Sequence, residues 1–215
     1  MKGKQMKKSI GKFLVKTGAL RFGDFTLKSG RKSPYFVNTG IICEGKEFLE
    51  LCEFIASKIE GMGGCDVVYG PAYKGIPLAV GVAIALSKKG KKVYWLFNRK
   101  EEKAHGDKGV FVGHVPAAGE SVVLVDDVFT TGGTKYENVE LLKGIGVKLK
   151  AVVVAVDREE KGEKGSAVKE FSGKTGVPVK SVATTSEIFE ELKGKEVSEE
   201  VYRKFLAYRR EYGSA

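Results

Sequence analysis

Four short apolar runs alternate with amphipathic segments along the middle of the chain. The runs lie at residues 67–69, 93–97, 122–125 and 151–156. Apolar residues at helical spacing occupy about 74–88 and 135–145, and another helical stripe covers residues 46–60. This alternation predicts right-handed βαβ units and a mostly parallel central sheet flanked by helices on both faces. Ligands bind beyond the carboxyl ends of the strands in such sheets, so the loops after these runs are the first place to look for chemistry.

The first 42 residues depart from this pattern. Ile10, Phe13 and Leu14 lie at helical spacing and predict an ordinary amphipathic helix. Residues 21–42, with Pro34 and several glycines, are typical of an irregular or β-rich lobe. A length of 215 residues suits one α/β domain with a substantial core. We therefore expect a single domain over residues 1–215, with a small N-terminal hood contributed by about residues 1–42.

The third apolar run leads into the segment with the most specific chemistry, SVVLVDDVFTTGGT at residues 121–134. Two adjacent carboxylates, Asp126 and Asp127, precede a threonine- and glycine-rich turn, and a helical pattern begins near Lys135. Backbone N–H groups and hydroxyls of such a turn can face one anion at a helix N-terminus. Adjacent carboxylates repel each other and favour a cation or hydroxyl partner. The segment thus predicts a ribose 5-phosphate site, in preference to a polar turn whose glycines serve only the turn.

The other three runs are also followed by loops rich in polar side chains. GPAYKGIP follows the first run, NRKEEKAHGDKG the second and Asp157-Arg158 the fourth. The basic and aromatic residues of these loops are Tyr73, Lys74, Arg99, Lys100, Lys103, His105 and Arg158. Each loop alone could be a solvated turn. Four such loops at one sheet edge, with cations facing a sugar-phosphate site, favour a binding site.

Residues 98–115 contain three glycines and alternating charges without apolar periodicity. We expect a long structureless loop here, and such loops in compact domains often serve as active-site lids. A flexible lid of this kind could place its basic residues on a diphosphate leaving group. It could also reach a neighbouring subunit, which would make the active protein a dimer.

Composition narrows the class of protein. Hydrophobic residues make up 42% and charged residues 30%, as in soluble globular proteins, and the formal net charge is +10. The lysines are scattered and are not interleaved with aromatics, which favours a locally cationic cleft over nucleic-acid binding. We expect no membrane span, no signal peptide and a cytoplasmic location. Cys43, Cys52 and Cys65 show no CxxC spacing, so we expect buried or half-buried thiols with no disulfide or zinc site.

Five segments together resemble one known family. They are TLKSGRKSPYFVNTG (26–40), YGPAYKGIPLA (69–79), FNRKEEKAHGDKG (97–109), VLVDDVFTTGGT (123–134) and VDREEKG (156–162). The fourth is similar to the loop of type I phosphoribosyltransferases that binds PRPP (5-phosphoribosyl 1-diphosphate). The others, in the same order, resemble orotate phosphoribosyltransferases over nearly the whole chain. The resemblance implies the type I phosphoribosyltransferase fold and, with Mg²⁺, the reaction of orotate with PRPP to give orotidine 5′-phosphate and diphosphate on the route to UMP.

The resemblance also implies site residues. The residues implied to bind PRPP are Lys28, Tyr73, Lys74, Arg99, Lys100, Lys103, His105, Asp126, Asp127, Val128, Phe129, Thr130, Thr131, Gly132, Gly133 and Thr134. Those implied to lie against orotate are Lys28, Phe36, Val37, Thr130 and Arg158. A second aromatic often takes the position of Val37 in this family, so stacking there is weakened while backbone contacts stay open. The resemblance further implies a homodimer that shares its active-site loop.

Roles follow from the chemistry of bond cleavage, which builds positive charge on the ribose and negative charge on the leaving group. Lys103 is our first choice of catalytic residue, and His105 takes a leaving-group role with general-acid assistance possible. Asp126 and Asp127 would order ribose hydroxyls and outer-shell water, because Mg²⁺ keeps water and would be held mainly by PRPP. Lys28 and Arg158 are candidates for the orotate carboxylate, Arg158 as a bidentate fork. The alternatives are a phosphoribosyltransferase for a purine base and a non-catalytic regulator that binds nucleic acid.

Overall fold

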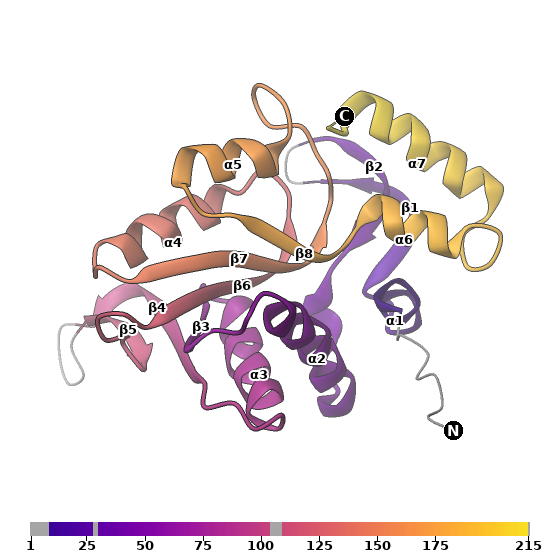
Figure 1. Cartoon of the computed structure of the whole chain (residues 1–215). Helices are drawn as coiled ribbons and strands as arrows, with labels where there is room; N and C mark the ends of the chain where they lie inside the picture. The colour runs from indigo at the N-terminus through magenta and orange to yellow at the C-terminus, as the bar shows by residue number, and fades with distance from the viewer. Residues whose placement is uncertain (1–8, 28–29, 104–108, 215) are drawn as a thin grey trace.

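The computed structural model describes residues 9–27, 30–103 and 109–214, and its centre is a six-stranded sheet (Figure 1). In spatial order its strands are β5 (Gly109–Gly113), β4 (Tyr94–Lys103), β3 (Val67–Gly70), β6 (Ser121–Phe129), β7 (Lys148–Asp157) and β8 (Val179–Thr184). The pairings β4–β3, β3–β6, β6–β7 and β7–β8 are parallel, and β5 runs antiparallel to β4. The predicted sheet, with all four apolar runs as strands, is confirmed.

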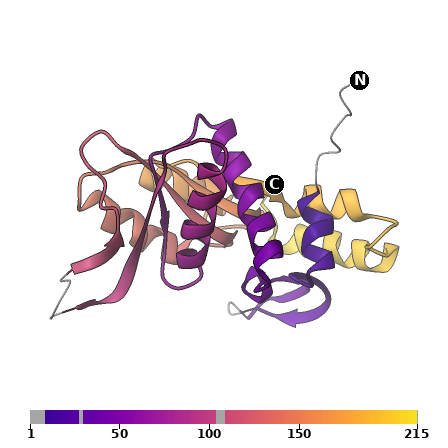
Figure 2. The same ribbon diagram turned by 90° about the horizontal axis from the view of Figure 1, so that it is seen from below.

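Helices cover both faces of the sheet. Helices α2 (Gly45–Gly61) and α3 (Gly75–Ser87) lie on one face, and α4 (Gly133–Lys143) and α5 (Ala167–Thr175) lie on the other (Figures 1 and 2). Alternation along β6 shows why its run is continuously apolar: Val123 and Val125 join the core beneath α2 and α3, whereas Val122 and Leu124 join the core beneath α4 and α5.

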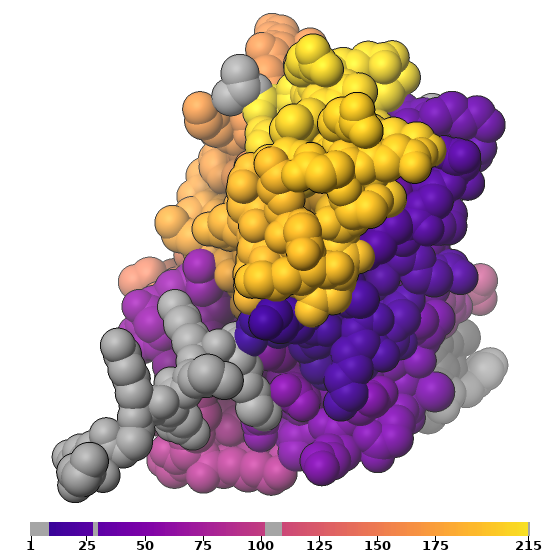
Figure 3. Space-filling model, turned by 90° about the vertical axis from the view of Figure 1, so that its right-hand side faces the viewer, coloured from indigo at the N-terminus to yellow at the C-terminus, as the bar shows by residue number. Residues whose placement is uncertain are grey.

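The N-terminal part forms a hood at one end of the sheet. It consists of α1 (Ile10–Lys16), the hairpin of β1 (Leu20–Thr26) and β2 (Lys32–Val37), and the short helix η1 (Thr39–Ile41). The predicted helix buries Ile10, Phe13 and Leu14 as expected. The C-terminal helices α6 (Thr185–Leu192) and α7 (Glu199–Tyr212) pack directly against the hood, as the yellow and indigo surfaces of Figure 3 show. Side chains of the hood, the sheet and these helices share one hydrophobic core, which supports the proposal of a single domain.

The expectation of a structureless loop at residues 98–115 is wrong for the part that the structure describes. Strand β4 continues to Lys103, and β5 returns antiparallel to it, with Asn98 opposite Phe111 and Lys103 opposite Gly109. The charged residues of β4 hide this strand from a search for apolar periodicity, because a strand near a sheet edge needs little apolar surface. Residues 104–108, the expected tip of the lid, lie outside the described part.

The strand order contains a switch point between β3 and β6. From β3 the chain crosses through α3 to β4 on one side, and from β6 it crosses through α4 to β7 on the other. The loops after β3 and β6 therefore diverge above one crevice, which is where open α/β sheets bind ligands. Within the described residues, no helix is long and apolar enough to span a bilayer.

Candidate active site

The phosphate loop, residues 129–134, joins β6 to α4 at this switch point. Gly132 has a φ of +82°, a left-handed conformation that favours glycine. A Cβ there would lie 3.0 Å from the Phe129 ring and 3.2 Å from that of Phe171. Thr130, Thr131, Gly133 and Thr134 are exposed, whereas Phe129 is buried. The loop is thus anchored from below and open above, at the positive end of the α4 dipole, as an anion site requires.

Asp127 faces the loop that follows β3. Only 8% of the residue is exposed, and its Oδ2 lies 2.9 Å from the Lys74 Nζ and 3.5 Å from the Thr39 Oγ1. The Lys74 ammonium also lies 3.4 Å from the Asn38 Oδ1. Lys74 immediately precedes α3, so the switch point brings the predicted cation and the predicted acid together. The hood completes this cluster through Asn38 and Thr39.

Asp126 faces inward, to a residue that the sequence reasoning did not select. Its Oδ2 lies 2.5 Å from the Nζ of Lys135, and its Oδ1 accepts a hydrogen bond from the Asp127 N–H at 2.9 Å. Burial raises the pKa of the Asp126 carboxyl, and the positive charge of Lys135 opposes that rise. The signal for Lys135 was its place in the first turn of a helix, where the dipole disfavours a cation that has no anionic partner.

Three polar side chains tie the loops at the crevice to one another. The Tyr69 hydroxyl, at the end of β3, hydrogen-bonds to Asn138 on α4 and lies 2.9 Å from the Asn98 Oδ1 on β4. Asn98 also accepts a hydrogen bond from the Ala72 N–H at 3.0 Å, and Asn138 donates to the Thr134 carbonyl at 2.7 Å. The ends of β3, β4 and the phosphate loop are therefore held as one unit. Sequence reasoning missed these residues because their partners are distant along the chain.

The hairpin of β4 and β5 holds the next predicted residues. Tyr73 is 69% exposed, and the Lys100 ammonium lies 4.8 Å from the centre of its ring. The Arg99 guanidinium instead donates to the Gly109 carbonyl at 2.9 Å and so links the two strands of the hairpin. Tyr73 and Lys100 thus meet at the open edge of the crevice, whereas Arg99 is engaged within the hairpin.

Phe36 and Val37 occupy opposite faces of β2. Phe36 is half-buried and stacks on Phe25 at 5.5 Å, with the Arg21 guanidinium 5.9 Å from its ring centre. Val37 is buried in the hydrophobic core, so only its backbone is free for a ligand, as the absence of an aromatic there suggested. The structure does not place the two side chains together.

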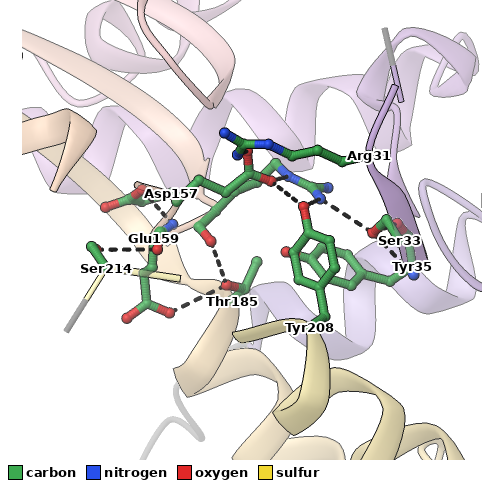
Figure 4. A network of polar contacts seen from close by, with 10 residues as sticks. Arg31, Ser33, Tyr35, Asp157, Glu159, Thr185, Tyr208 and Ser214 are labelled. Atoms are coloured by element: carbon green, nitrogen blue, oxygen red, sulfur yellow. Dashed lines mark hydrogen bonds and ion pairs between the residues drawn. The ribbon is translucent and has the colours of Figure 1, made fainter. Parts of the chain in front are cut away.

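Arg158 lies in a network of polar contacts with Ser33 of the hood and Tyr208 of α7, two residues that Figure 4 labels. The residue is 4% exposed, and its Nε lies 2.6 Å from the Glu160 Oε1. Its Nη2 donates to the Ser33 Oγ at 3.3 Å and to the Tyr208 hydroxyl at 3.2 Å, and its guanidinium lies 4.3 Å from the Tyr35 ring centre. Arg158 thus faces the inner side of β2, opposite to Phe36. The Nε and Nη2 atoms of the predicted fork already have partners inside the protein.

Three predictions concern residues that the structure does not describe fully. Lys28 and His105 lie outside the described residues, and only the backbone of Lys103 is described. Among the described residues, no group of three or more His, Cys, Asp or Glu side chains could hold a metal ion. The two acids of the crevice, Asp126 and Asp127, each face a lysine, and this donor set suits a cation carried largely by a substrate's own oxygens.

The prediction for the thiols is wrong at one position. Cys52 is buried and Cys65 half-buried, as expected, but Cys43 is exposed. Cys43 lies between η1 and α2, where the chain passes over the surface before the helical stripe begins. Burial raises the pKa of both Cys52 and Cys65 to about 12, so these two are unreactive side chains of the core.

The chain matches known proteins over nearly its whole length. Residues 38–197 match the phosphoribosyl transferase domain family. The orotate phosphoribosyltransferase of Nitrosococcus oceani is 44% identical over 205 residues, covering 94% of this chain and 93% of that relative, and that of Methylococcus capsulatus is 43% identical over 206 residues, covering 94% and 95%. The crystal structure of the Francisella tularensis orotate phosphoribosyltransferase has a TM-score of 0.82 and 39% identity, covering 94% of this chain and 98% of that one. The chain belongs to the phosphoribosyltransferase family, in its orotate phosphoribosyltransferase branch.

Proposed function

We propose that this protein transfers the 5-phosphoribosyl group of PRPP to orotate, giving orotidine 5′-phosphate and diphosphate in pyrimidine biosynthesis. The observation that carries the proposal is the paired acids followed by an open phosphate loop at the switch point of the sheet. Family membership over nearly the full chain names the acceptor. The cations around the crevice suit two anionic substrates.

Two parts of the crevice suit the sugar donor: the phosphate loop and the paired acids. The exposed residues of the phosphate loop would hold the ribose 5-phosphate at the N-terminus of α4; they are Thr130, Thr131, Gly133 and Thr134. Asp126 and Asp127 lie on β6 just before it and would hold the ribose hydroxyls. Lys74 now neutralises Asp127 and, with its side chain 56% exposed, is free to turn to a substrate oxygen. The ribose would thereby be fixed at both ends, which lowers the entropic part of the barrier.

The leaving group would meet the cations of the hairpin. Lys100 and Tyr73 lie together at the edge of the crevice, and the family resemblance assigns Lys103 and His105 to the same diphosphate. Positive side chains placed there stabilise charge that grows on the diphosphate as the bond to C1′ breaks. Mg²⁺, when bound with PRPP, would neutralise part of that charge. We also propose that Arg99 contacts PRPP, although its guanidinium donates a hydrogen bond to the backbone of β5 in the structure.

The base would lie under the hood. Phe36 offers a half-buried ring and Thr130 an exposed hydroxyl, and Val37 offers only backbone atoms. Lys28 and Arg158 remain the proposed partners of the orotate carboxylate. Two-point binding by Arg158 would require the Nη2 atom to leave Ser33 or Tyr208, so we propose a single contact through the rest of the fork.

We further propose a homodimer that shares the hairpin of β4 and β5. Trp95 and Phe97 stack at 5.7 Å on one face of β4, and Trp95 is 37% exposed. Leu96 points into the core beneath α4, so the aromatic pair faces the side of α3, where Ile84 is 49% exposed. A second copy of the chain on this apolar face would lie beside the hairpin that carries Lys103. The cytoplasmic location stays a prediction from the sequence.

Mixed dimers test the shared hairpin. Lys103→Ala and the double variant Asp126→Asn/Asp127→Asn should each have greatly reduced activity alone. Dissociation and remixing of the two should recover activity, because some mixed dimers then contain one site with an intact hairpin and intact acids. Absence of any recovery, with mixed dimers demonstrated by mass spectrometry, would contradict the sharing.

Release of diphosphate, measured with PRPP and one base at a time, tests the function itself. We expect turnover with orotate and none with uracil, hypoxanthine or adenine, because only orotate carries a carboxylate. Turnover of hypoxanthine but not orotate would refute the proposal in favour of a purine enzyme. Salt-dependent RNA binding without any diphosphate release would instead favour the nucleic-acid-binding regulator.

A further inference from the structure

A lysine buried behind the two acids has no part in the mechanism above. Lys135 is 6% exposed, and its Nζ lies 2.5 Å from the Asp126 Oδ2 and 3.0 Å from the Val128 carbonyl oxygen. It belongs to the first turn of α4, where the helix dipole disfavours a cation. A buried ammonium also costs free energy unless it is paired. The Asp126 carboxylate beside it supplies the counter-charge that this place in the fold requires.

The two lysine–aspartate pairs of the crevice differ in their access to solvent. The side chain of Lys74 is 56% exposed, whereas that of Lys135 is 8% exposed. Lys74 reaches Asp127 from the open crevice, so a substrate can displace it. Lys135 reaches Asp126 from inside the fold, between α4 and β6, and it also holds the backbone at Val128. A ligand that enters from the crevice would therefore leave the pair of Lys135 and Asp126 intact.

We propose that Lys135 is a positioning residue for the sugar donor: it holds the Asp126 carboxylate ionised and oriented, and it fixes the backbone from which the phosphate loop departs. The proposal rests on the proposed function, in which Asp126 holds a ribose hydroxyl. Lys135 occupies Oδ2 of Asp126 and the Asp127 N–H occupies Oδ1. The carboxylate is thereby fixed at both oxygens, and its remaining lone pairs have a defined direction toward a hydroxyl donor.

The charges around Asp126 support an effect on its ionisation. Burial raises the pKa of this carboxyl, the Lys135 ammonium lowers it, and the neighbouring Asp127 raises it again. Asp127 in turn faces Lys74. Removal of Lys135 leaves burial and the charge of Asp127, which both raise this pKa, opposed only by the hydrogen bond from the Asp127 N–H. The pKa of Asp126 must then rise further, so the activity that depends on its charge is lost at a higher pH than before.

Steady-state kinetics of three variants test the proposal. Lys135→Met removes the charge and keeps much of the bulk, Lys135→Arg keeps the charge, and Lys143→Met on the exposed end of α4 is the matched control. We expect Lys135→Met to lower kcat/KM for PRPP by roughly 10- to 100-fold, the effect of losing a charged hydrogen bond. For Lys135→Met, the fall of kcat/KM on the acid side of its pH profile should occur at a higher pH than in the parent. Lys135→Arg should retain most activity, and Lys143→Met should match the parent.

A double-mutant cycle separates positioning from a direct role. If Lys135 acts through Asp126, Lys135→Met should have little further effect in an Asp126→Asn background. Equal losses in both backgrounds, or an unmoved acid limb, would overturn the proposal. Should Lys135→Met fail to fold by circular dichroism, Lys135→Gln takes its place in the cycle, with the same outcomes required.

Calorimetric binding of PRPP separates this proposal from the proposed function. It measures the donor without any base, so it reports on Lys135 even if orotate is not the acceptor. Weaker PRPP binding by Lys135→Met together with no orotate turnover by the parent protein would sink the proposed acceptor and leave the role of Lys135 standing. Unchanged PRPP affinity in a folded Lys135→Met variant would sink the role of Lys135, whatever the acceptor.

Discussion

Replacement of Glu160 by glutamine should destabilise the fold strongly, because it removes a charge at the centre of the network beneath the hood. Both Glu160 and Arg158 have side chains only 3% exposed. The Glu160 carboxylate accepts from the Arg158 Nε at 2.6 Å, from the Tyr208 hydroxyl at 2.7 Å and from the Arg31 Nη1 at 3.0 Å. An amide of the same shape keeps one acceptor but turns its NH₂ toward a donor. Arg158 is then a buried cation without a counter-charge.

The expected magnitude follows from this geometry. Loss of one partner from a buried ion pair costs about 3–5 kcal/mol, a large part of the roughly 5–15 kcal/mol that stabilises a typical domain. At about 2–4 °C per kcal/mol for a chain of this size, the melting temperature should fall by roughly 6–20 °C. The Tyr208→Phe variant loses only the hydroxyl and should be destabilised less, by about 1.5–3 kcal/mol.

Urea unfolding followed by circular dichroism gives these free energies by linear extrapolation. The control is Glu140→Gln, which removes the charge from an exposed pair with Lys143 and should cost no more than about 0.5 kcal/mol. A Glu160→Gln variant no less stable than Glu140→Gln would refute the reasoning, since it would mean that Arg158 finds another counter-charge or water. Stabilisation would refute it more strongly.

Three further results are expected. Gly132→Ala should raise the KM for PRPP, because alanine at a φ of +82° is strained by about 1–2 kcal/mol and meets the Phe129 ring. The control Gly176→Ala, at a φ of +73° in open space, should lose stability with no change in that KM. Equal KM values for the two variants would contradict the anchoring of the loop. Lys103→Ala should depress kcat far more than it raises the KM for orotate, and a pure binding loss in steady-state assays would count against its catalytic role. Iodoacetamide at pH 8 should label Cys43 alone in the folded protein and all three cysteines in urea, as counted by mass spectrometry; rapid labelling of a second thiol before unfolding would show that the burial is incomplete.

The central sheet was predictable from the sequence because its strands are covered on both faces. Each apolar run is continuous for that reason, and the segment with Asp126 and Asp127 follows directly from the third run. The hairpin of β4 and β5 was not predictable in this way, because charged residues fill the outer part of β4. The elements after residue 157, α5 to α7 with β8, were also not predicted.

The finer geometry of the site depends on contacts between residues far apart in the sequence. The positions of Asp127 and Lys74 followed from the strand order, because neighbouring parallel strands end at the same edge. The burial of Lys135 could not be predicted from the sequence, since a lysine near a helix start is ordinarily expected to be exposed to solvent. The engagement of Arg158 by Tyr208 joins residues 50 positions apart and had no local signal.

The packing of α7 against β2 sets an order in which the protein can be completed during synthesis. The hood is made first, yet Tyr35 of β2 meets Tyr208 only after some 170 further residues have been added. The central sheet can gather its strands earlier, because most of their pairings join segments closer in sequence. The surface proposed for the base is therefore the last part of the crevice to become structured as the chain leaves the ribosome, and the phosphate loop can form before it.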